Sequence, residues 1–243
     1  MGNKLLDTLV ESKPSEINLN DRGLKEFSER LTTITELESL YLSNNKIKEI
    51  PESISNIKKL STLNLYHNKI TKIPTTINAI SCLRYLNVSN NNISEIPSGF
   101  GSCPNLEVLD LSCNNISSIR SNFGYLTTLK ALYMSDNKIE TLPPEFTNLT
   151  KLETISLRNN KLTSLPDNIG KLKNLKEFLL QGNKLKVLPI SLSDCPLVGE
   201  NRYLKLAGNP LHKDIINQLN KGGTEALFEL MKSIEYYDII ENK

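Results

Sequence analysis

The sequence has little of the chemistry that metal sites and many active sites need. It contains no tryptophan, and its two histidines are His67 and His212. Its four cysteines have no C-x-x-C spacing and lie at Cys82, Cys103, Cys113 and Cys195. Zinc sites need paired Cys or His ligands, and a disulfide framework needs an oxidising compartment. We therefore predict four free thiols, no metal and no cofactor.

Long apolar runs and an excess of one charge are also missing. No segment reaches the roughly 18 apolar residues of a membrane helix, and residues 1–10 lack the apolar stretch of a secretory signal. The chain has 29 Lys and Arg against 27 Asp and Glu, a net charge of +2. This balance gives no electrostatic case for nucleic acid or an anionic membrane. We expect a cytoplasmic protein that binds no nucleic acid and does not insert into a membrane.

The common catalytic motifs are absent as well. The sequence has no G-x-x-x-x-G-K-[ST] or G-x-G-x-x-G phosphate loop, no G-x-S-x-G elbow and no H-E-x-x-H motif. Two isolated histidines cannot supply most acid–base or metal constellations. We therefore predict that the chain is not an enzyme.

What the sequence does have is a repeat of 23 residues. Each copy carries the phrase L-x-x-L-x-L-x-x-N-x-L-x-x-L and, in most copies, a proline directly after it. The asparagines of the seven copies are Asn45, Asn68, Asn91, Asn114, Asn137, Asn160 and Asn183. A fixed period of 20 to 50 residues is typical of solenoid proteins. The phrase resembles that of the leucine-rich repeat family.

The phrase itself predicts the local structure. The L-x-L alternation is typical of a short strand with its leucines facing inward. The asparagine carboxamide has two donors and an acceptor, so it can satisfy backbone groups that stacking would bury. Apolar residues at every third position after each proline favour short 3₁₀ turns. We predict an α/β solenoid, a leucine-rich repeat horseshoe with a parallel concave sheet, a 3₁₀ or irregular convex side, and helical caps.

The ends of the chain are degenerate copies, as the ends of a stack should be. We predict an N-terminal cap helix and degenerate first repeat over 1–36, seven regular repeats over 37–196, and a degenerate last repeat with a helical cap over 197–243, all in one domain. The apolar residues Leu5, Leu6, Leu9 and Val10 have helical spacing and could cover the first repeat.

The C-terminal segment predicts two helices separated by a break. Leu211 to Leu219 forms the first, and Gly222-Gly223 interrupts the chain. The second carries one apolar stripe, made of Leu227, Leu230, Met231 and Ile234. This helix could close the open core or bind a partner, and the sequence leaves both open.

The cysteines differ in their place in the repeat. Cys103 and Cys195 take positions that Ile57 and Leu149 hold in other copies, so we expect them in the core. Cys82 is expected at the surface, and Cys113 at the end of a strand on the concave side.

Positions between the inward leucines should face the concave side, because side chains alternate across a strand. These variable positions are the natural binding surface of a solenoid. Tyrosine and arginine, common interface anchors, recur there. The predicted protein-binding residues are Asp110, Tyr133, Arg158, Tyr41, Tyr66, His67, Arg84, Tyr85, Lys130 and Asp136. The preference of exposed strand positions for tyrosine is the alternative explanation.

Three of these residues come from consecutive strands. Neighbouring strands lie about 4.8 Å apart, so Asp110, Tyr133 and Arg158 should form one contiguous patch. An acid, a tyrosine and an arginine together suit a protein partner of mixed charge. They could equally pair with one another.

Several phrases resemble the Ras suppressor family of leucine-rich repeat proteins. They are residues 15–24, 123–137 and 149–189, together with the final helix from Leu227 onward. The segment between Asn115 and Phe123 is shorter than in animal members. The resemblance implies a monomeric intracellular adaptor that binds the last LIM domain of a PINCH-like protein and so joins the integrin-linked kinase and parvin assembly at cell–matrix adhesions. It also implies a link to Ras signalling.

The resemblance gives the three-residue patch a more specific role. The family's LIM-contacting surface uses an acid, a tyrosine and an arginine, which correspond to Asp110, Tyr133 and Arg158. The alternative is a scaffold like Shoc-2, which bridges a Ras-type GTPase and a phosphatase but has many more repeats. A repeat-bearing enzyme would need a catalytic domain, and a secreted receptor would need a signal peptide and cysteine-paired caps. The sequence shows none of these.

Overall fold

The computed structural model describes residues 3–241, with side chains from Asp7 onward. The chain divides into two compact units, Met1–Ile116 and Ser117–Lys243. Both units are built from the same repeating element, a three-residue strand followed by a turn and a short 3₁₀ helix. The predicted fold class, a solenoid of parallel strands with 3₁₀ turns, is confirmed.

The first unit begins with helix α1 (Asn3–Ser12) and continues with five parallel strands in chain order. The strands are β1 (Glu16–Asn18), β2 (Ser39–Tyr41), β3 (Thr62–Asn64), β4 (Tyr85–Asn87) and β5 (Val108–Asp110). Each residue pairs with the one 23 positions later, as Leu40 does with Leu63. The sequence period is therefore the register of the sheet. The lid residues Leu5 and Leu6 lie outside the described side chains.

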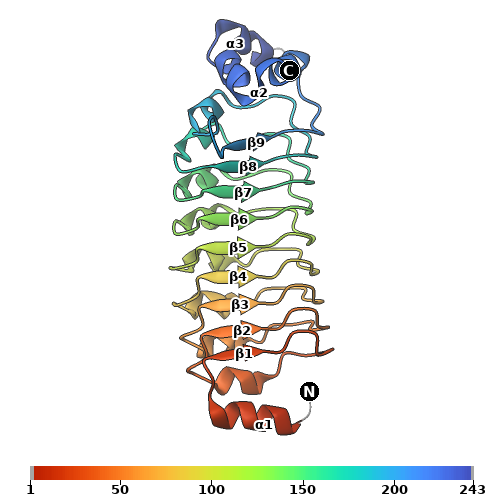
Figure 1. Ribbon diagram of the computed structural model, residues 1–243, viewed down its shortest axis with the longest axis vertical. Coiled ribbons are helices and arrows are strands. Elements are labelled where there is room, and N and C mark those ends of the chain that lie inside the picture. Colours follow the sequence, from red (N-terminus) through yellow and green to blue (C-terminus); the bar gives the residue numbers. More distant parts are fainter. Residues whose placement is uncertain (1–2, 242–243) are drawn as a thin grey trace. The chain divides into compact units, whose positions relative to one another are not determined.

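The second unit has four parallel strands in chain order, followed by two helices. They are β6 (Ala131–Tyr133), β7 (Thr154–Ser156), β8 (Glu177–Leu179), β9 (Tyr203–Lys205), α2 (Lys213–Met231) and α3 (Ile234–Glu241). The last step is longer, because Phe178 pairs with Leu204. Figure 1 shows how the strands follow one another within each unit.

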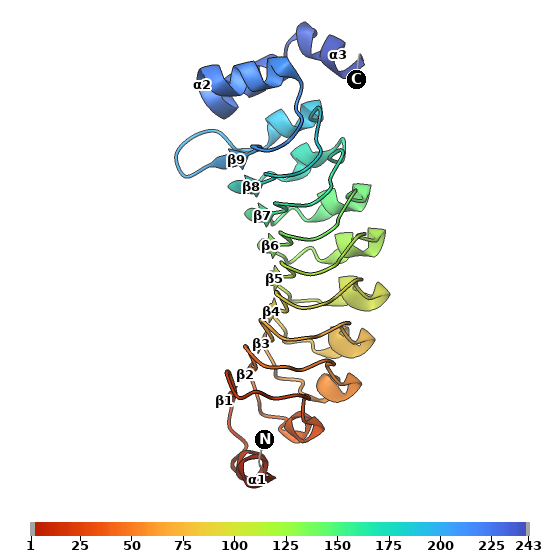
Figure 2. The ribbon, with the colours of Figure 1, turned by 90° about the vertical axis from the view of Figure 1, so that its right-hand side faces the viewer.

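Short 3₁₀ helices lie on the side of each unit opposite the strands (Figure 2). In the first unit they span Glu29–Thr33, Glu52–Asn56, Thr75–Ala79 and Ser98–Ser102, and in the second Ser121–Tyr125, Pro144–Asn148, Ile169–Lys171 and Ile190–Asp194. A proline precedes most of them in an extended conformation, such as Pro74 with φ −65°. Proline suits this position because its ring fixes φ and the first turn needs no N–H donor there.

The leucines of the phrase point into the interior. Leu40, Leu63, Leu86 and Leu109 are fully buried at the centres of β2 to β5. Burying one such side chain contributes roughly 1.5–3 kcal/mol. In the second unit the rings of Phe123 and Phe146 stack between successive 3₁₀ turns, with centroids 6.4 Å apart and 4° between their planes. One packing solution is thus repeated along each unit.

The seven repeat asparagines are buried and bonded to backbone groups. Asn91 shows the full pattern. Its Nδ2 donates to the carbonyl oxygens of Leu65 and Val88 at 3.0 Å each, and its Oδ1 accepts from the N–H of Ile70 at 2.8 Å. One carboxamide therefore binds its own turn and the turn of the preceding repeat. We call these seven residues the asparagine ladder.

The residue before each of the seven ladder asparagines has a left-handed backbone. His67, Cys113 and Asp136 have φ of +53°, +53° and +56°. This conformation costs most residues about 1–2 kcal/mol, and Asn, Asp and Gly tolerate it best. Gly182 holds this position after β8, where a Cβ would lie 2.4 Å from Asn159 Oδ1. The backbone therefore limits the residue types allowed here.

The C-terminal helices correct one prediction. α2 is interrupted at Gly222 and Gly223, as expected, but Ile234 is not on the buried stripe of the following segment. It is 83% exposed and begins the separate helix α3. Tyr236 is the buried residue of α3, and its hydroxyl donates to Leu188 O at 2.8 Å and accepts from Leu188 N–H at 3.1 Å. Burial raises the pKa of this phenol.

The cysteines are free thiols of two kinds. Cys103 and Cys195 are buried, and burial raises the pKa of each thiol to about 12. Cys82 and Cys113 are exposed. These placements agree with the positions of the four cysteines in the repeat.

Candidate protein-binding face

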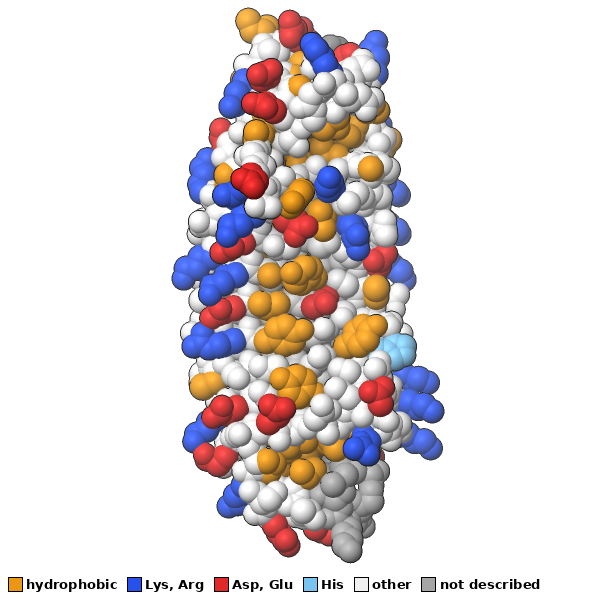
Figure 3. All heavy atoms as spheres, in the orientation of Figure 1, with side chains coloured by type: hydrophobic (Ala, Val, Ile, Leu, Met, Phe, Trp, Pro, Cys, Tyr) orange, Lys and Arg blue, Asp and Glu red, His pale blue; other side chains and the backbone are white. Residues whose placement is uncertain are grey.

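Each strand presents a second set of side chains that points away from the core. We call this surface the strand face; it comprises the outward residues of each strand, the residue before the strand, and the two residues before each ladder asparagine. Figure 3 shows it, with apolar and aromatic side chains along the strands and charged side chains mainly at the edges. All ten predicted protein-binding residues lie on it and are half-buried or exposed.

Aromatic side chains mark the strand face of the first unit. Tyr41 and Tyr85 are half-buried, on β2 and β4, and Tyr66 is 41% exposed. The rings of Tyr66 and His67 lie 5.9 Å apart at 38°. His67 Nδ1 is 2.5 Å from Asn90 Nδ2 in the next repeat. These contacts hold the two rings in place while leaving them accessible.

Several outward strand residues also have a structural role that the sequence did not reveal. Asn64, Asn87 and Asp110 each accept a hydrogen bond from the N–H two residues later, at 2.9–3.0 Å. This local bond is an Asx turn, which Asn and Asp favour. Asp110 therefore stabilises the end of β5, where its Oδ1 accepts from Ser112 N–H.

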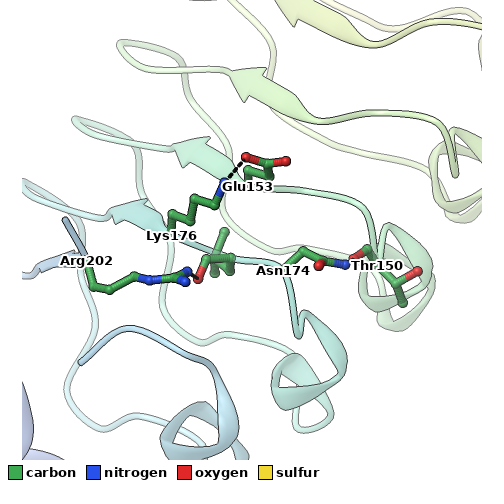
Figure 4. A network of polar contacts seen from close by, with 6 residues as sticks. Thr150, Glu153, Asn174, Lys176 and Arg202 are labelled. Carbon is green, nitrogen blue, oxygen red and sulfur yellow. Dashed lines mark hydrogen bonds and ion pairs between the residues drawn. The ribbon is translucent and has the colours of Figure 1, made fainter. Parts of the chain in front are cut away.

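Charged residues before the strands pair between neighbouring repeats. Arg84 binds Glu107 at 2.6 Å in the first unit, and Lys176 binds Glu153 at 2.5 Å in the second. Figure 4 shows the second pair beside Asn174 and Arg202, whose side chains donate to backbone carbonyl oxygens. Both pairs join positions 23 residues apart. Exposed pairs contribute little stability, about 0–1 kcal/mol each.

The strand face of the second unit is more polar. Tyr133 is half-buried on β6, Lys130 precedes that strand, and Arg158 is exposed just after β7. Asn159 Nδ2 donates to Asp136 Oδ1 at 2.8 Å. At the other end of this unit, the Lys205 ammonium lies 5.7 Å from the centre of the Tyr203 ring.

The three-residue patch is divided between the units. Asp110 belongs to the first unit, and Tyr133 and Arg158 belong to the second. Within the second unit Tyr133 pairs with Ser156, and Arg158 O accepts from Asp136 N–H at 2.8 Å. The contiguous patch of all three stays a prediction.

The described side chains include no group of three or more His, Cys, Asp or Glu residues placed to hold a metal ion. Among helices of the described chain, none is both long and apolar enough to cross a membrane. The described strand face presents aromatic, hydrogen-bonding and paired charged groups.

The repeated strands and 3₁₀ turns define a solenoid. The family model for the leucine-rich repeat matches residues 17–70, 35–93, 81–139, 104–162 and 128–185, which together cover more than half of the chain. The chain belongs to the leucine-rich repeat family. No curated protein matches it by sequence.

Several solved structures are similar to this chain in fold. A leucine-rich repeat protein of Leptospira interrogans is 30% identical, with a TM-score of 0.66 over 84% of this chain and 57% of its own. The plant peptide hormone receptor RGFR1, solved in complex with RGF2, is 31% identical, with a TM-score of 0.58 over 76% of this chain and 34% of its own. A TDR receptor at 23% identity has a TM-score of 0.75 over 86% of this chain and 41% of its own. The chain thus spans less than two thirds of each.

Leucine-rich repeat proteins generally act as non-enzymatic binding scaffolds, and the fold commonly mediates protein–protein interaction. Their binding surfaces use the side chains that vary between repeats. In this chain those side chains are the strand face.

Proposed function

We propose that this protein is a protein-interaction adaptor that binds its partner on the strand face. The single observation that carries the proposal is Tyr66. This side chain is 41% exposed and packs beside His67, yet it follows β3 and is not part of the strand. The β-propensity of tyrosine therefore does not account for it. An exposed, ordered aromatic pair is typical of an interface anchor.

Tyr41 supports the same proposal. The equivalent residues Asn64, Asn87 and Asp110 each close an Asx turn with their side chain. A tyrosine cannot make this bond, and Ser43 N–H donates instead to Asn20 Oδ1 of the preceding repeat at 2.7 Å. The chain thus gives up a local hydrogen bond and gains a half-buried aromatic side chain on the face.

We propose a LIM domain of a PINCH-like adaptor as the partner, in adhesion and Ras-related signalling. The support is the resemblance of residues 15–24, 123–137 and 149–189 to the Ras suppressor family. The types of Asp110, Tyr133 and Arg158 agree with that family's LIM-contacting residues. RGFR1, which is similar to this chain in fold, was solved in complex with RGF2. This complex is a precedent for binding by a protein of similar fold.

The test titrates purified single LIM domains of a PINCH-like adaptor against the full chain by isothermal calorimetry. One variant changes the first unit, Tyr41→Ala/Tyr66→Ala, and a second changes the other unit, Tyr133→Ala/Arg158→Ala. The matched control is Tyr125→Ala, because this tyrosine is 70% exposed but lies on a 3₁₀ turn away from the strand face. Circular dichroism verifies the fold of each variant.

We expect one LIM domain to bind the wild type and the control equally. Each face variant should weaken binding at least tenfold, because an anchor residue contributes more than about 1.4 kcal/mol. Unchanged binding in both face variants would refute the strand face as the binding surface. Binding of a purified Ras-type GTPase or phosphatase without any LIM domain would favour the Shoc-2-like scaffold instead.

A further inference from the structure

The second unit has an open sheet edge that the strand face does not include. Its last strand, β9, pairs with β8 on one side. Tyr203 N–H donates to Lys176 O and Lys205 O accepts from Leu180 N–H, both at 2.9 Å. In a parallel sheet, alternate residues bond to opposite neighbours. The intervening Leu204 therefore directs its backbone groups to the free side of β9.

The preceding repeats show which donors this edge leaves unused. Leu157 N–H donates to Leu179 O at 2.8 Å, and Leu180 N–H donates to Lys205 O at 2.9 Å. Leu206 is the equivalent residue in the last repeat. In the same way, Gly182 N–H donates to Ala207 O at 2.9 Å, and Gly208 is the equivalent residue in the next repeat. Within residues 3–241 neither the Leu206 N–H nor the Gly208 N–H makes a hydrogen bond.

A groove of about 410 Å³ runs along this free edge. Leu204, Leu206 and Leu211 line it from the β9 side, and Ile216 and Leu219 line it from α2. Figure 3 shows apolar side chains gathered between the β9 and α2 regions of the surface. The groove therefore combines free backbone donors with apolar walls.

Two polar groups in the groove indicate what it would bind. Gln181 Oε1 is buried and, among the described residues, has no hydrogen-bond partner. Lys205 is exposed and is the only charged side chain among the described residues that line the groove. A bound chain could donate an N–H to Gln181 and place a carboxylate near Lys205.

We propose that this groove binds an extended peptide segment of a partner protein, which adds to β9 as a further strand. An open edge with free N–H and C=O groups is the template for such strand addition. The peptide has apolar residues at alternate positions, facing Leu206 and Ile216, and an Asp or Glu near Lys205. The site includes Gln181 and Lys205 of the strand face, but none of the residues that are substituted to test the proposed function.

The test selects a random 12-residue peptide phage library on the full chain and measures synthetic copies of the enriched peptides by fluorescence anisotropy. The groove variant is Ile216→Glu, which adds a charge to an apolar wall at a residue 41% exposed. The matched control is Ile234→Glu, because Ile234 is an exposed isoleucine on α3 that does not line the groove. Lys205→Glu is a second groove variant, and it tests the charge preference.

We expect enriched peptides with alternating apolar residues and an acidic residue. Ile216→Glu should weaken their binding at least tenfold and Lys205→Glu three- to tenfold, and Ile234→Glu should leave it unchanged. N-methylation of alternate peptide nitrogens should also weaken binding tenfold. In hydrogen exchange, the Leu206 and Gly208 amides should be protected on binding.

Failure to enrich any peptide would overturn the proposal. So would peptides whose binding is unaffected by both groove variants, or peptides that leave the Leu206 and Gly208 amides unprotected. Peptides whose binding is weakened by Tyr66→Ala but not by Ile216→Glu would place recognition on the strand face instead. The proposal and the LIM-domain hypothesis therefore fail in different experiments.

Discussion

Inward and outward side chains of the same strand follow different rules in this protein. At the centres of β2 to β5 the inward residue is leucine each time, and each is fully buried. The outward residue at the ends of these strands is Tyr41, Asn64, Asn87 or Asp110. The same packing recurs in the interior, because each inward leucine lies beside the inward leucine of the repeat 23 residues away. The strand face is open to solvent on one side, so its residues can differ from one repeat to the next.

The largest expected difference between interior and face is in thiol reactivity. Cys103 lies in the core and Cys113 at the face, and burial raises the pKa of the Cys103 thiol from 9.0 to about 12. At pH 8 that shift alone lowers the thiolate fraction roughly 1000-fold. We expect Ellman's reagent to modify Cys82 and Cys113 quickly, and Cys103 and Cys195 only when the chain unfolds. Rapid modification of all four, read by peptide mass spectrometry, would contradict the comparison.

The next largest effect should come from the stacked rings of the second unit. Phe146→Ala removes a fully buried side chain that stacks on Phe123. We expect the free energy of unfolding to fall by about 4 kcal/mol, from lost burial and the cavity that remains. Urea denaturation followed by circular dichroism measures this change. A loss below about 1 kcal/mol would mean that the turns repack.

A smaller loss is expected in the asparagine ladder. Asn91→Ala leaves Ile70 N–H without its acceptor, and it removes one of the two ladder donors from the carbonyl oxygens of Leu65 and Val88. We expect a loss of about 2 kcal/mol, because one buried N–H without a partner costs about 1–3 kcal/mol. The adjacent Asn92 is exposed, so Asn92→Ala is the control and should change stability by less than about 0.5 kcal/mol. Equal effects of the two substitutions would refute the ladder's role.

The smallest effect on stability should come from the strand face. Tyr66→Ala removes an exposed ring, and we expect the unfolding free energy to change by less than about 0.5 kcal/mol. Binding of the partner should nevertheless weaken at least tenfold. A loss of more than about 2 kcal/mol would contradict the contrast between interior and face, because Tyr66 would then be a structural residue.

Much of the fold could be predicted because the repeat is a local pattern. Alternation of Leu40 with its neighbours gives the strand, and the 23-residue step gives the register in which Leu40 pairs with Leu63. Spacing of three after Pro51 and Pro74 gives the 3₁₀ turns. The bounds of the C-terminal helices were harder to predict. Ile234 continues the helical spacing of Leu230 but begins another helix, because the chain turns after Met231.

The candidate site was predictable in position but only partly in role. Alternation places Tyr41, Tyr85 and Asp110 on the outward side, where the structure shows them. It does not show that Asp110 closes an Asx turn or that Arg84 already pairs with Glu107. It also gives no sign of the free edge of β9. These features depend on hydrogen bonds and pairings that residue types alone do not specify.

The sequence by itself determined the parallel strands, their register, and the family of this protein. It could do so because each repeat interacts mainly with the copies before and after it, and the same residues recur at every step. Only the tertiary structure decided how the last repeat is closed. There Tyr236 reaches back to Leu188, 48 residues earlier, and α2 leaves a groove beside β9. Contacts of this kind occur once in the chain, so no periodic pattern encodes them.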